Sequence, residues 1–125
     1  MILLDTSILI ELFRKKNKQK AVFFQLANQG QTFSISTITY YEVLSGSNLQ
    51  QDAFWQGLLK TITILPFDLE CAKQAVMLYK MLKSQNKLID LADLAIAATA
   101  LANDLELATL NKKHFTHIQG LKIVN

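Results

Sequence analysis

Cysteine and histidine are scarce in this sequence, which limits the kinds of site that it can build. Cys71 is the single cysteine among 125 residues, so no disulfide can form within the chain. The two histidines, His114 and His117, do not combine with Cys71 at the spacing that zinc ligands show. Nothing in the sequence brings Cys71 beside either histidine as a nucleophile and its base. We therefore expect neither a zinc site nor a cysteine nucleophile.

Long hydrophobic runs are also missing from the sequence. No run reaches the roughly 20 apolar residues that span a membrane, because Asp93 interrupts the longest one, from Leu91 to Ala102. Asp5 follows after only four residues, without the basic start and apolar core of a secretory signal. We therefore expect a cytoplasmic protein that makes no contact with membranes.

The chain lacks a strong charge of either sign, although basic residues outnumber acidic ones. The formal net charge is +3, and 50% of the residues are hydrophobic, which is too many for a disordered chain. At about 150 residues per domain, the length favours one domain that covers residues 1–125. The densest basic run, from Arg14 to Lys20, favours an anionic partner only weakly, because such runs are usually solvated surface.

Short apolar runs alternate with segments of helical periodicity. Strands are predicted at residues 1–4, 32–36, 61–65, 106–109 and 121–124. Helices are predicted after Asp5, from Val22 to a stop at Gly30, from about Thr39, from Asp68 through Leu82, and from about Asp90 to Asn103. This alternation indicates an α/β domain with a mainly parallel sheet.

Four polar residues stand at strand ends or in the first turns of helices. They are Asp5, Glu42, Asp93 and Asn111. In open parallel sheets, ligands bind outside the carboxyl ends of the strands, so residues far apart in the sequence can converge there. We therefore expect a cluster of carboxylates at this edge of the sheet.

Each acid also has a purely structural interpretation. Asp5 could cap the helix that follows it, and the two interpretations of Asp5 are equally good. Glu42 lies three residues after Thr39, which is the spacing of a capping box, and taken alone this favours the cap. Asp90 is a candidate cap for the last helix, and the helix dipole favours Asp93 one turn later.

Asp93 fits a structural role least well. The residues from Leu91 to Ala102 are otherwise apolar on nearly all sides, which indicates a helix buried on most faces. A buried carboxylate needs a cation or several donors, and no Arg or Lys lies in this helix, so a metal ion is an economical partner. Oxygen ligands without Cys or His favour Mg²⁺ or Mn²⁺. Such an ion activates water, which predicts hydrolysis of a phosphodiester.

Four segments resemble the motifs of PIN domains, in the right order and over nearly the whole chain. The segments and their polar residues are 1–10 with Asp5, 34–43 with Glu42, 89–98 with Asp93, and 108–115 with Asn111. The first is a hydrophobic strand that ends in an acid followed by Thr or Ser. The third has its acid directly ahead of an apolar Ile-Ala-Ala step, and the fourth is Thr-x-Asn followed by Phe.

This resemblance implies a three-layer α/β/α sandwich with a mainly parallel central sheet. It implies that Asp5, Glu42 and Asp93 bind Mg²⁺ or Mn²⁺ and act in catalysis together with Asn111. The supporting residues would be Thr6, Ser7 and Thr109. Small PIN proteins of this size resemble VapC toxins of type II toxin–antitoxin pairs, which form homodimers, cleave RNA such as tRNA or ribosomal RNA, and are silenced by a VapB antitoxin.

One departure from the family pattern limits the expected metal content. Asn111 stands where many PIN nucleases have a fourth Asp, so one well-occupied ion is expected rather than two. Two other functions stay open on the sequence alone. One is a catalytically silent PIN-like module that binds RNA or protein, and the other is a structure-specific DNA nuclease, which the same carboxylates could serve.

Overall fold

The computed structural model describes all of residues 1–125 and contains four strands, six α-helices and two short 3-10 helices. The strands are β1 (Ile2–Leu4), β2 (Phe33–Ser36), β3 (Thr63–Leu65) and β4 (Glu106–Ala108). The α-helices are α1 (Thr6–Arg14), α2 (Val22–Asn28), α3 (Thr37–Ser45), α4 (Leu49–Leu59), α5 (Leu69–Ser84) and α6 (Leu91–Ala102). The 3-10 helices are η1 (Lys18–Lys20) and η2 (Lys112–His114). None of the helices is both long enough and apolar enough to cross a bilayer.

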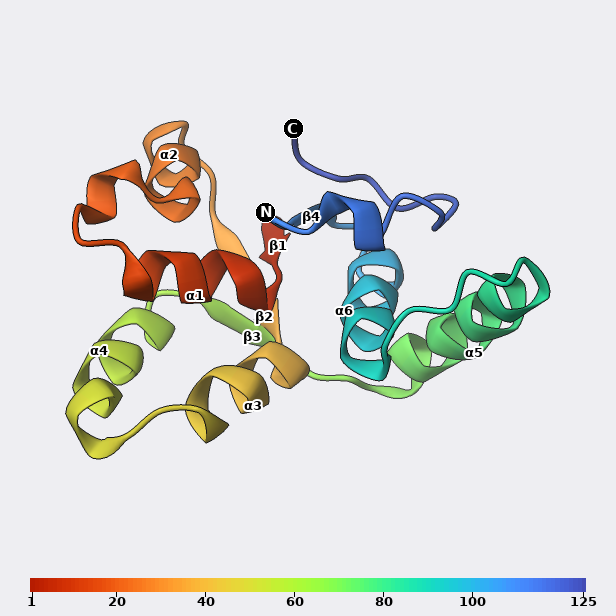
Figure 1. Ribbon diagram of the computed structural model, residues 1–125, viewed down its shortest axis with the longest axis horizontal. Helices are drawn as coiled ribbons and strands as arrows, with labels where there is room; N and C mark the ends of the chain where they lie inside the picture. The colour runs from red at the N-terminus through yellow and green to blue at the C-terminus, as the bar shows by residue number, and fades with distance from the viewer.

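The four strands form one parallel sheet in the order β3-β2-β1-β4. Leu4 is paired in register with Ile35 on one side and with Ala108 on the other, so three strands end level with one another. The sheet lies between two groups of helices (Figure 1), which confirms the predicted three-layer α/β/α architecture with a parallel sheet. The carboxyl ends of β1, β2 and β4 therefore share one edge.

Successive residues of β1 point into two separate cores. Ile2 and Leu4 belong to a cluster with residues of α1, α2 and α4, including Trp55, whereas Leu3 belongs to a cluster with residues of α5 and α6. Both clusters are almost fully buried, as expected when helices cover both faces of a parallel sheet. Helix α3 follows β2 and contacts both α1 and α6, so it bridges the two sides.

Most helices begin where a short polar side chain accepts a hydrogen bond from the first turn. Asp5, Asp68 and Asp90 cap α1, α5 and α6, as the sequence predicted. Helix α4 was not predicted, because its apolar residues follow no simple amphipathic pattern. It begins with a capping box in which Asn48 and Gln51 bind each other's backbone N–H groups.

One sequence prediction about the sheet edge is wrong, and the bounds of α3 differ slightly from the prediction. The predicted strand at residues 121–124 is a single bridge between Ile123 and Leu107, because only the N–H and C=O of Leu107 bond to this segment. The start of α3, predicted at about Thr39, lies two residues earlier. The helix begins at Thr37 because the hydroxyl of Ser36 accepts from the N–H of Ile38.

The C-terminal end of α1 is held by Lys18, a residue from outside the helix. Its ammonium group donates to the carbonyl oxygens of Leu12, Phe13 and Lys15, each at 2.9 Å. The same group lies 5.3 Å from the ring centroid of Phe54. A cation at this end of a helix satisfies carbonyls that have no partner in the helix and interacts favourably with the helix dipole. Lys18 therefore fixes the helix that carries several residues of the site described below.

Replacement of Lys18 by Met should lower the free energy of unfolding by about 1–2 kcal/mol, because charge-assisted bonds to three carbonyls are lost. Lys20→Met is the matched control, since Lys20 is exposed in the same short helix and its side chain makes no hydrogen bond or salt bridge. Urea denaturation of both variants measures the difference. Equal stability of the two variants would show that the Lys18 contacts contribute nothing.

Candidate functional site

The centre of the site is Asp5, at the end of the central strand β1. Its backbone N–H donates to the carbonyl of Ala108 in β4 at 3.0 Å, so the ladder between the two strands continues to this residue. Its carboxylate accepts from the N–H of Ile8 at 3.3 Å and so caps α1. The side chain is almost inaccessible, with 3% of the residue exposed. Asp5 therefore caps α1, but this cap uses only part of the hydrogen-bonding capacity of its carboxylate.

Two hydroxyl groups complete the surroundings of the Asp5 carboxylate. Ser7 donates to Oδ1 and Thr109 donates to Oδ2. Both hydroxyls in turn accept from the loop after β4, since the N–H of Leu110 donates to Ser7 at 3.0 Å and the N–H of Asn111 donates to Thr109 at 2.9 Å. Burial raises the pKa of the Asp5 carboxyl above its usual value, although these hydrogen bonds act in the opposite direction.

Glu42 reaches the same edge from α3. Its Oε1 accepts from the hydroxyl of Thr6 at 2.6 Å, and the Thr6 hydroxyl lies 3.2 Å from that of the buried Thr39. The capping-box interpretation of Thr39 and Glu42 is wrong, because Ser36 caps α3 and places Glu42 beyond the first turn. The Glu42 carboxylate is therefore held toward α1 by a contact between two helices.

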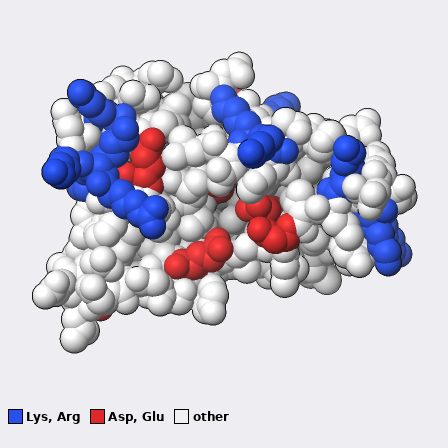
Figure 2. All heavy atoms as spheres, in the orientation of Figure 1, with Lys and Arg blue, Asp and Glu red and all other residues white.

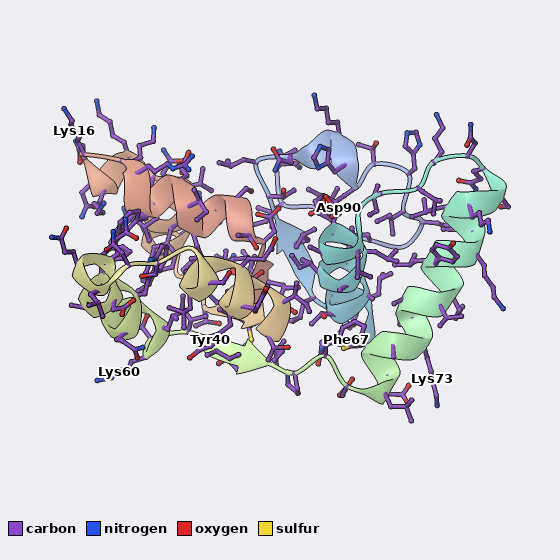
Figure 3. The ribbon with its side chains drawn as sticks, turned by 60° about the horizontal axis from the view of Figure 1, so that its bottom comes forward. Lys16, Tyr40, Lys60, Phe67, Lys73 and Asp90 are labelled. Atoms are coloured by element: carbon purple, nitrogen blue, oxygen red, sulfur yellow. The ribbon has the colours of Figure 1, made fainter.

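Asp93 lies in the first turn of α6. Asp90 caps this helix by accepting from the N–H of Asp93 at 2.8 Å, and Figure 3 shows Asp90 at the start of α6. Oδ2 of Asp93 lies 3.1 Å from Nδ1 of His114 in η2. Burial and the negative charge of Asp90 raise the pKa of Asp93, whereas His114 lowers it. The sequence places no Arg or Lys beside Asp93 within its helix, and the structure brings a histidine to it from outside the helix.

These residues share one cleft of about 480 Å³. Its lining includes five of the carboxylates and is mostly polar. The lining residues are Asp5, Thr6, Ser7, Ile10, Glu11, Arg14, Glu42, Asp90, Asp93, Leu110, Asn111 and His114. Figure 2 shows acidic side chains in the middle of this face, with basic side chains to the left and above. The carboxylates expected at the carboxyl edge thus line one cleft, and Thr109 donates to Asp5 although it is not among the lining residues.

The sequence did not predict three ionisable side chains of the cleft, Glu11, Arg14 and His114, and His114 was considered only beside Cys71. Glu11 and Arg14 follow Ser7 at helical spacing on one face of α1, a signal that could have placed them. Glu11 also accepts from the N–H of Val22 at 2.8 Å and so binds the start of α2. The contact of His114 with Asp93 depends on the path of the loop after β4, for which the sequence carries no signal.

The donor chemistry of the cleft fits a hard divalent cation. Asp5, Glu42 and Asp93 offer carboxylate oxygens, which Mg²⁺ and Mn²⁺ prefer, and the buried Asp5 has no Lys or Arg partner. No three acidic, histidine or cysteine side chains stand close enough to form a ready-made set of ligands. Asp5 and Glu42 instead accept hydrogen bonds from neighbouring hydroxyls, and Asp93 lies against the ring of His114. The chemical type of these side chains therefore suits such an ion. Their positions in this structure are those that make the hydrogen bonds described above.

Comparisons with known proteins agree with this architecture. A family model described as PIN domain matches residues 2–121. The chain is 36% identical over 125 residues to a Methanocaldococcus jannaschii protein named Ribonuclease VapC1, covering 98% of this chain and 85% of that protein. It is 34% identical over 131 residues to the Ribonuclease VapC1 of Rickettsia felis, covering 98% and 94%. A solved structure of VapBC2 from Rickettsia felis, bound to a DNA fragment from its promoter, superimposes with a TM-score of 0.86 at 27% identity, covering 100% and 98%.

The raised pKa of Asp93 predicts how stability depends on pH in metal-free protein. A carboxyl whose pKa is higher in the folded than in the unfolded state stabilises the fold below its unfolded pKa, and this contribution is lost as pH rises through the folded pKa. Asp93→Asn should therefore be more stable than the wild type at pH 7. Near pH 3 this difference should disappear, because the wild-type carboxyl is then protonated.

Urea denaturation of the wild type and the variant at several pH values measures this effect in the presence of a chelator. Glu106→Gln is the control, because Glu106 is exposed at the opposite end of β4 and lies outside the cleft. A stability difference between Asp93→Asn and wild type that stays constant from acid to neutral pH would contradict the prediction.

Proposed function

The chain belongs to the PIN domain family, and from this premise we propose that it is a Mg²⁺- or Mn²⁺-dependent endoribonuclease, the toxin of a type II toxin–antitoxin pair. The observation that carries the proposal is the convergence of Asp5, Glu42 and Asp93 on one cleft at the carboxyl edge of the sheet. Relatives named Ribonuclease VapC1 support RNA as the substrate. In this proposal residues 1–125 act as one domain in the cytoplasm.

The proposed ligands of the divalent ion are Asp5, Glu42 and Asp93. A bound ion supplies Lewis-acid stabilisation of a phosphoryl oxygen and lowers the pKa of a water molecule. Its binding also offsets the cost of an ionised, buried Asp5 carboxylate, which burial otherwise disfavours. With Asn111 in place of a further acid, the cleft suits one tightly bound ion, because clustered carboxylates repel one another unless a cation balances them.

The neighbouring side chains hold these carboxylates in place. Ser7 and Thr109 fix the orientation of Asp5, and Thr6 fixes that of Glu42. Hydrogen-bonded neighbours of this kind orient metal ligands and restrict their rotamers. The Asn111 side chain is in the cleft wall, where its amide can hydrogen-bond a phosphate oxygen or a water.

Basic residues near the cleft suit a nucleic-acid substrate. Arg14 lines the cleft on one side, and Lys112 and Lys113 follow Asn111 directly on the other. Figure 2 shows that basic groups flank the acidic centre. Such residues attract phosphates that lie outside the acid cluster, where the carboxylates themselves would repel them. The proposed targets are structured cellular RNAs such as tRNA or ribosomal RNA.

The proposed protein partners are a VapB-like antitoxin and a second copy of the chain. The similarity to the VapBC2 complex supports an antitoxin. The carboxylates of the cleft predict the inhibitory contact, in which the antitoxin places an Arg or Lys side chain against them. A guanidinium or ammonium group pairs well with clustered carboxylates and takes the position that the metal ion would need.

Asp93→Asn should abolish most metal-dependent RNA cleavage while the fold is retained. We expect a loss of about 100-fold or more, because removing a ligand should exceed the ~10–100-fold cost of losing a residue that only orients one. Asp90→Asn is the matched control on the same helix turn. Asn caps a helix about as well as Asp, so this variant should keep its activity.

Cleavage of a mixed RNA pool, tRNA and flapped DNA across a Mn²⁺ titration provides the measurement. Full activity of Asp93→Asn would contradict the assignment of the ligands. Cleavage of flapped DNA in preference to both RNA substrates would identify a structure-specific DNA nuclease instead. Absence of any cleavage by folded wild type, with RNA still bound, would identify a catalytically silent module.

The antitoxin contact makes a second prediction. Co-expression with the product of the neighbouring open reading frame should yield an inactive complex, and activity should return when the partner is removed. Glu42→Gln should weaken this complex by about tenfold or more, as expected when one side of a buried charge pair is lost. Asp104→Asn, an exposed carboxylate outside the cleft, is the control. Equal affinity of both variants would place the contact elsewhere, and healthy growth of cells that overproduce uninhibited wild type would exclude toxicity.

A further inference from the structure

A second cavity lies on the other side of Leu110 from the acidic cleft. It has a volume of about 200 Å³, and Leu110 lines both cavities. Its remaining wall comes mainly from α2 and the loop after β4. The lining residues include Leu26, Gln25, Gln29, Thr109 and Lys112.

The cavity differs from the cleft in chemical character. No Asp or Glu side chain lines it, and 6 of its 11 lining residues are hydrophobic, including the buried Leu26. Gln25 and Gln29 stand four positions apart and present their amides from the same face of the helix end. Gln29 makes no side-chain hydrogen bond, and Gln25 makes only one of 3.5 Å to the carbonyl of Lys20. Both amides can therefore bind a ligand without giving up strong bonds.

The size of the cavity restricts the ligand. Pockets for drug-sized molecules measure ~300–1,000 Å³, so a cavity of about 200 Å³ takes a group no larger than one ring system. A planar, uncharged heterocycle with donors and acceptors on its edge satisfies the apolar wall and the two glutamine amides together. A nucleobase has this chemistry, and Gln is a common partner for base edges.

The position of the cavity fits the same ligand. Thr109 lines the cavity, and its hydroxyl donates to the Asp5 carboxylate, which lines the acidic cleft. Lys112 lines the cavity directly after Asn111 of the cleft and makes no salt bridge. A nucleotide could therefore extend its base past Leu110 while its phosphate stays near Lys112 and the cleft.

We propose that this cavity is a nucleobase-binding subsite, which holds one base of an RNA strand next to the phosphodiester in the acidic cleft. Gln25 and Gln29 contact the edge of the base, the apolar wall around Leu26 contacts its face, and Lys112 pairs with a phosphate. The inference rests on the proposed ribonuclease function and adds a determinant of sequence preference to it. An apolar side chain from a protein partner is a poorer occupant, because it would bury both amides without hydrogen bonds.

Binding can be tested without cleavage, in full-length, metal-free protein. The probes are AMP, GMP, CMP and UMP, with ribose 5-phosphate as the probe that lacks a base. In ¹H–¹⁵N correlation spectra, at least one nucleotide should shift the signals of α2 and of the Gln25 and Gln29 side-chain amides. Ribose 5-phosphate should shift only signals near Lys112. Identical shifts with all five probes, confined to Lys112, would overturn the subsite.

A double variant tests the glutamines. Gln25→Ala combined with Gln29→Ala should weaken binding of the preferred nucleotide by about fivefold to tenfold, the loss expected for one or two neutral hydrogen bonds. It should also flatten the base preference at the cleavage position in an RNA pool. Gln31→Ala is the control, because Gln31 is exposed, close in the sequence and outside both cavities. Unchanged affinity and unchanged preference in the double variant would overturn the proposal.

The outcomes separate this inference from the function on which it rests. RNA cleavage that depends on Asp93, with no base-dependent shifts in α2, would remove the subsite and leave the ribonuclease. Base-dependent shifts in a protein that cleaves no RNA would remove the ribonuclease and leave a nucleotide site. If the NMR signals of α2 shift only when the antitoxin is added and with no nucleotide, the cavity is a protein-binding pocket and the proposal is wrong.

Discussion

The buried carboxylate of Asp5 is the constraint on which the arrangement of this molecule depends. An ionised group with 3% of its residue exposed must find donors, and here they come from the first turn of α1 and from Thr109 beyond β4. Satisfying one side chain therefore joins the central strand, the helix that follows it and the last strand of the sheet. The same bonds carry the loop after β4 across the top of the sheet, which brings Asn111 and His114 to the cleft.

The other two acids repeat this pattern between different elements. Glu42 binds Thr6 and so connects α3 with α1, and Asp93 contacts His114 and so connects α6 with the last loop. Helices from both faces of the sheet therefore meet where its strands end. The hydrogen bonds between these elements also offset part of the repulsion between the carboxylates. The proposed cation site and the contacts between the layers thus use the same side chains.

Local chemistry explains which features could be predicted from the sequence. Apolar runs located all four strands to within two residues, and Asp5, Asp68 and Asp90 were identified as caps because capping depends on residues three positions away. The gathering of Asp5, Glu42 and Asp93 followed from parallel topology, whereas their role as ligands came from resemblance and stays a proposal. The Asp93–His114 contact and the cavity beside α2 depend on the path of loops in three dimensions, for which no periodicity exists.

The bond between Thr109 and Asp5 joins residues that are 104 positions apart. A contact of such high sequence separation is costly to close and forms late in folding. On the ribosome, chains grow at roughly 5–20 residues per second, so Asp5 is made roughly 5–20 s before the hydroxyl that completes its surroundings. Nascent chains that end before β4 contain Asp5 and Glu42 but lack the last strand of the sheet. The complete cleft is therefore a property of nearly finished chains.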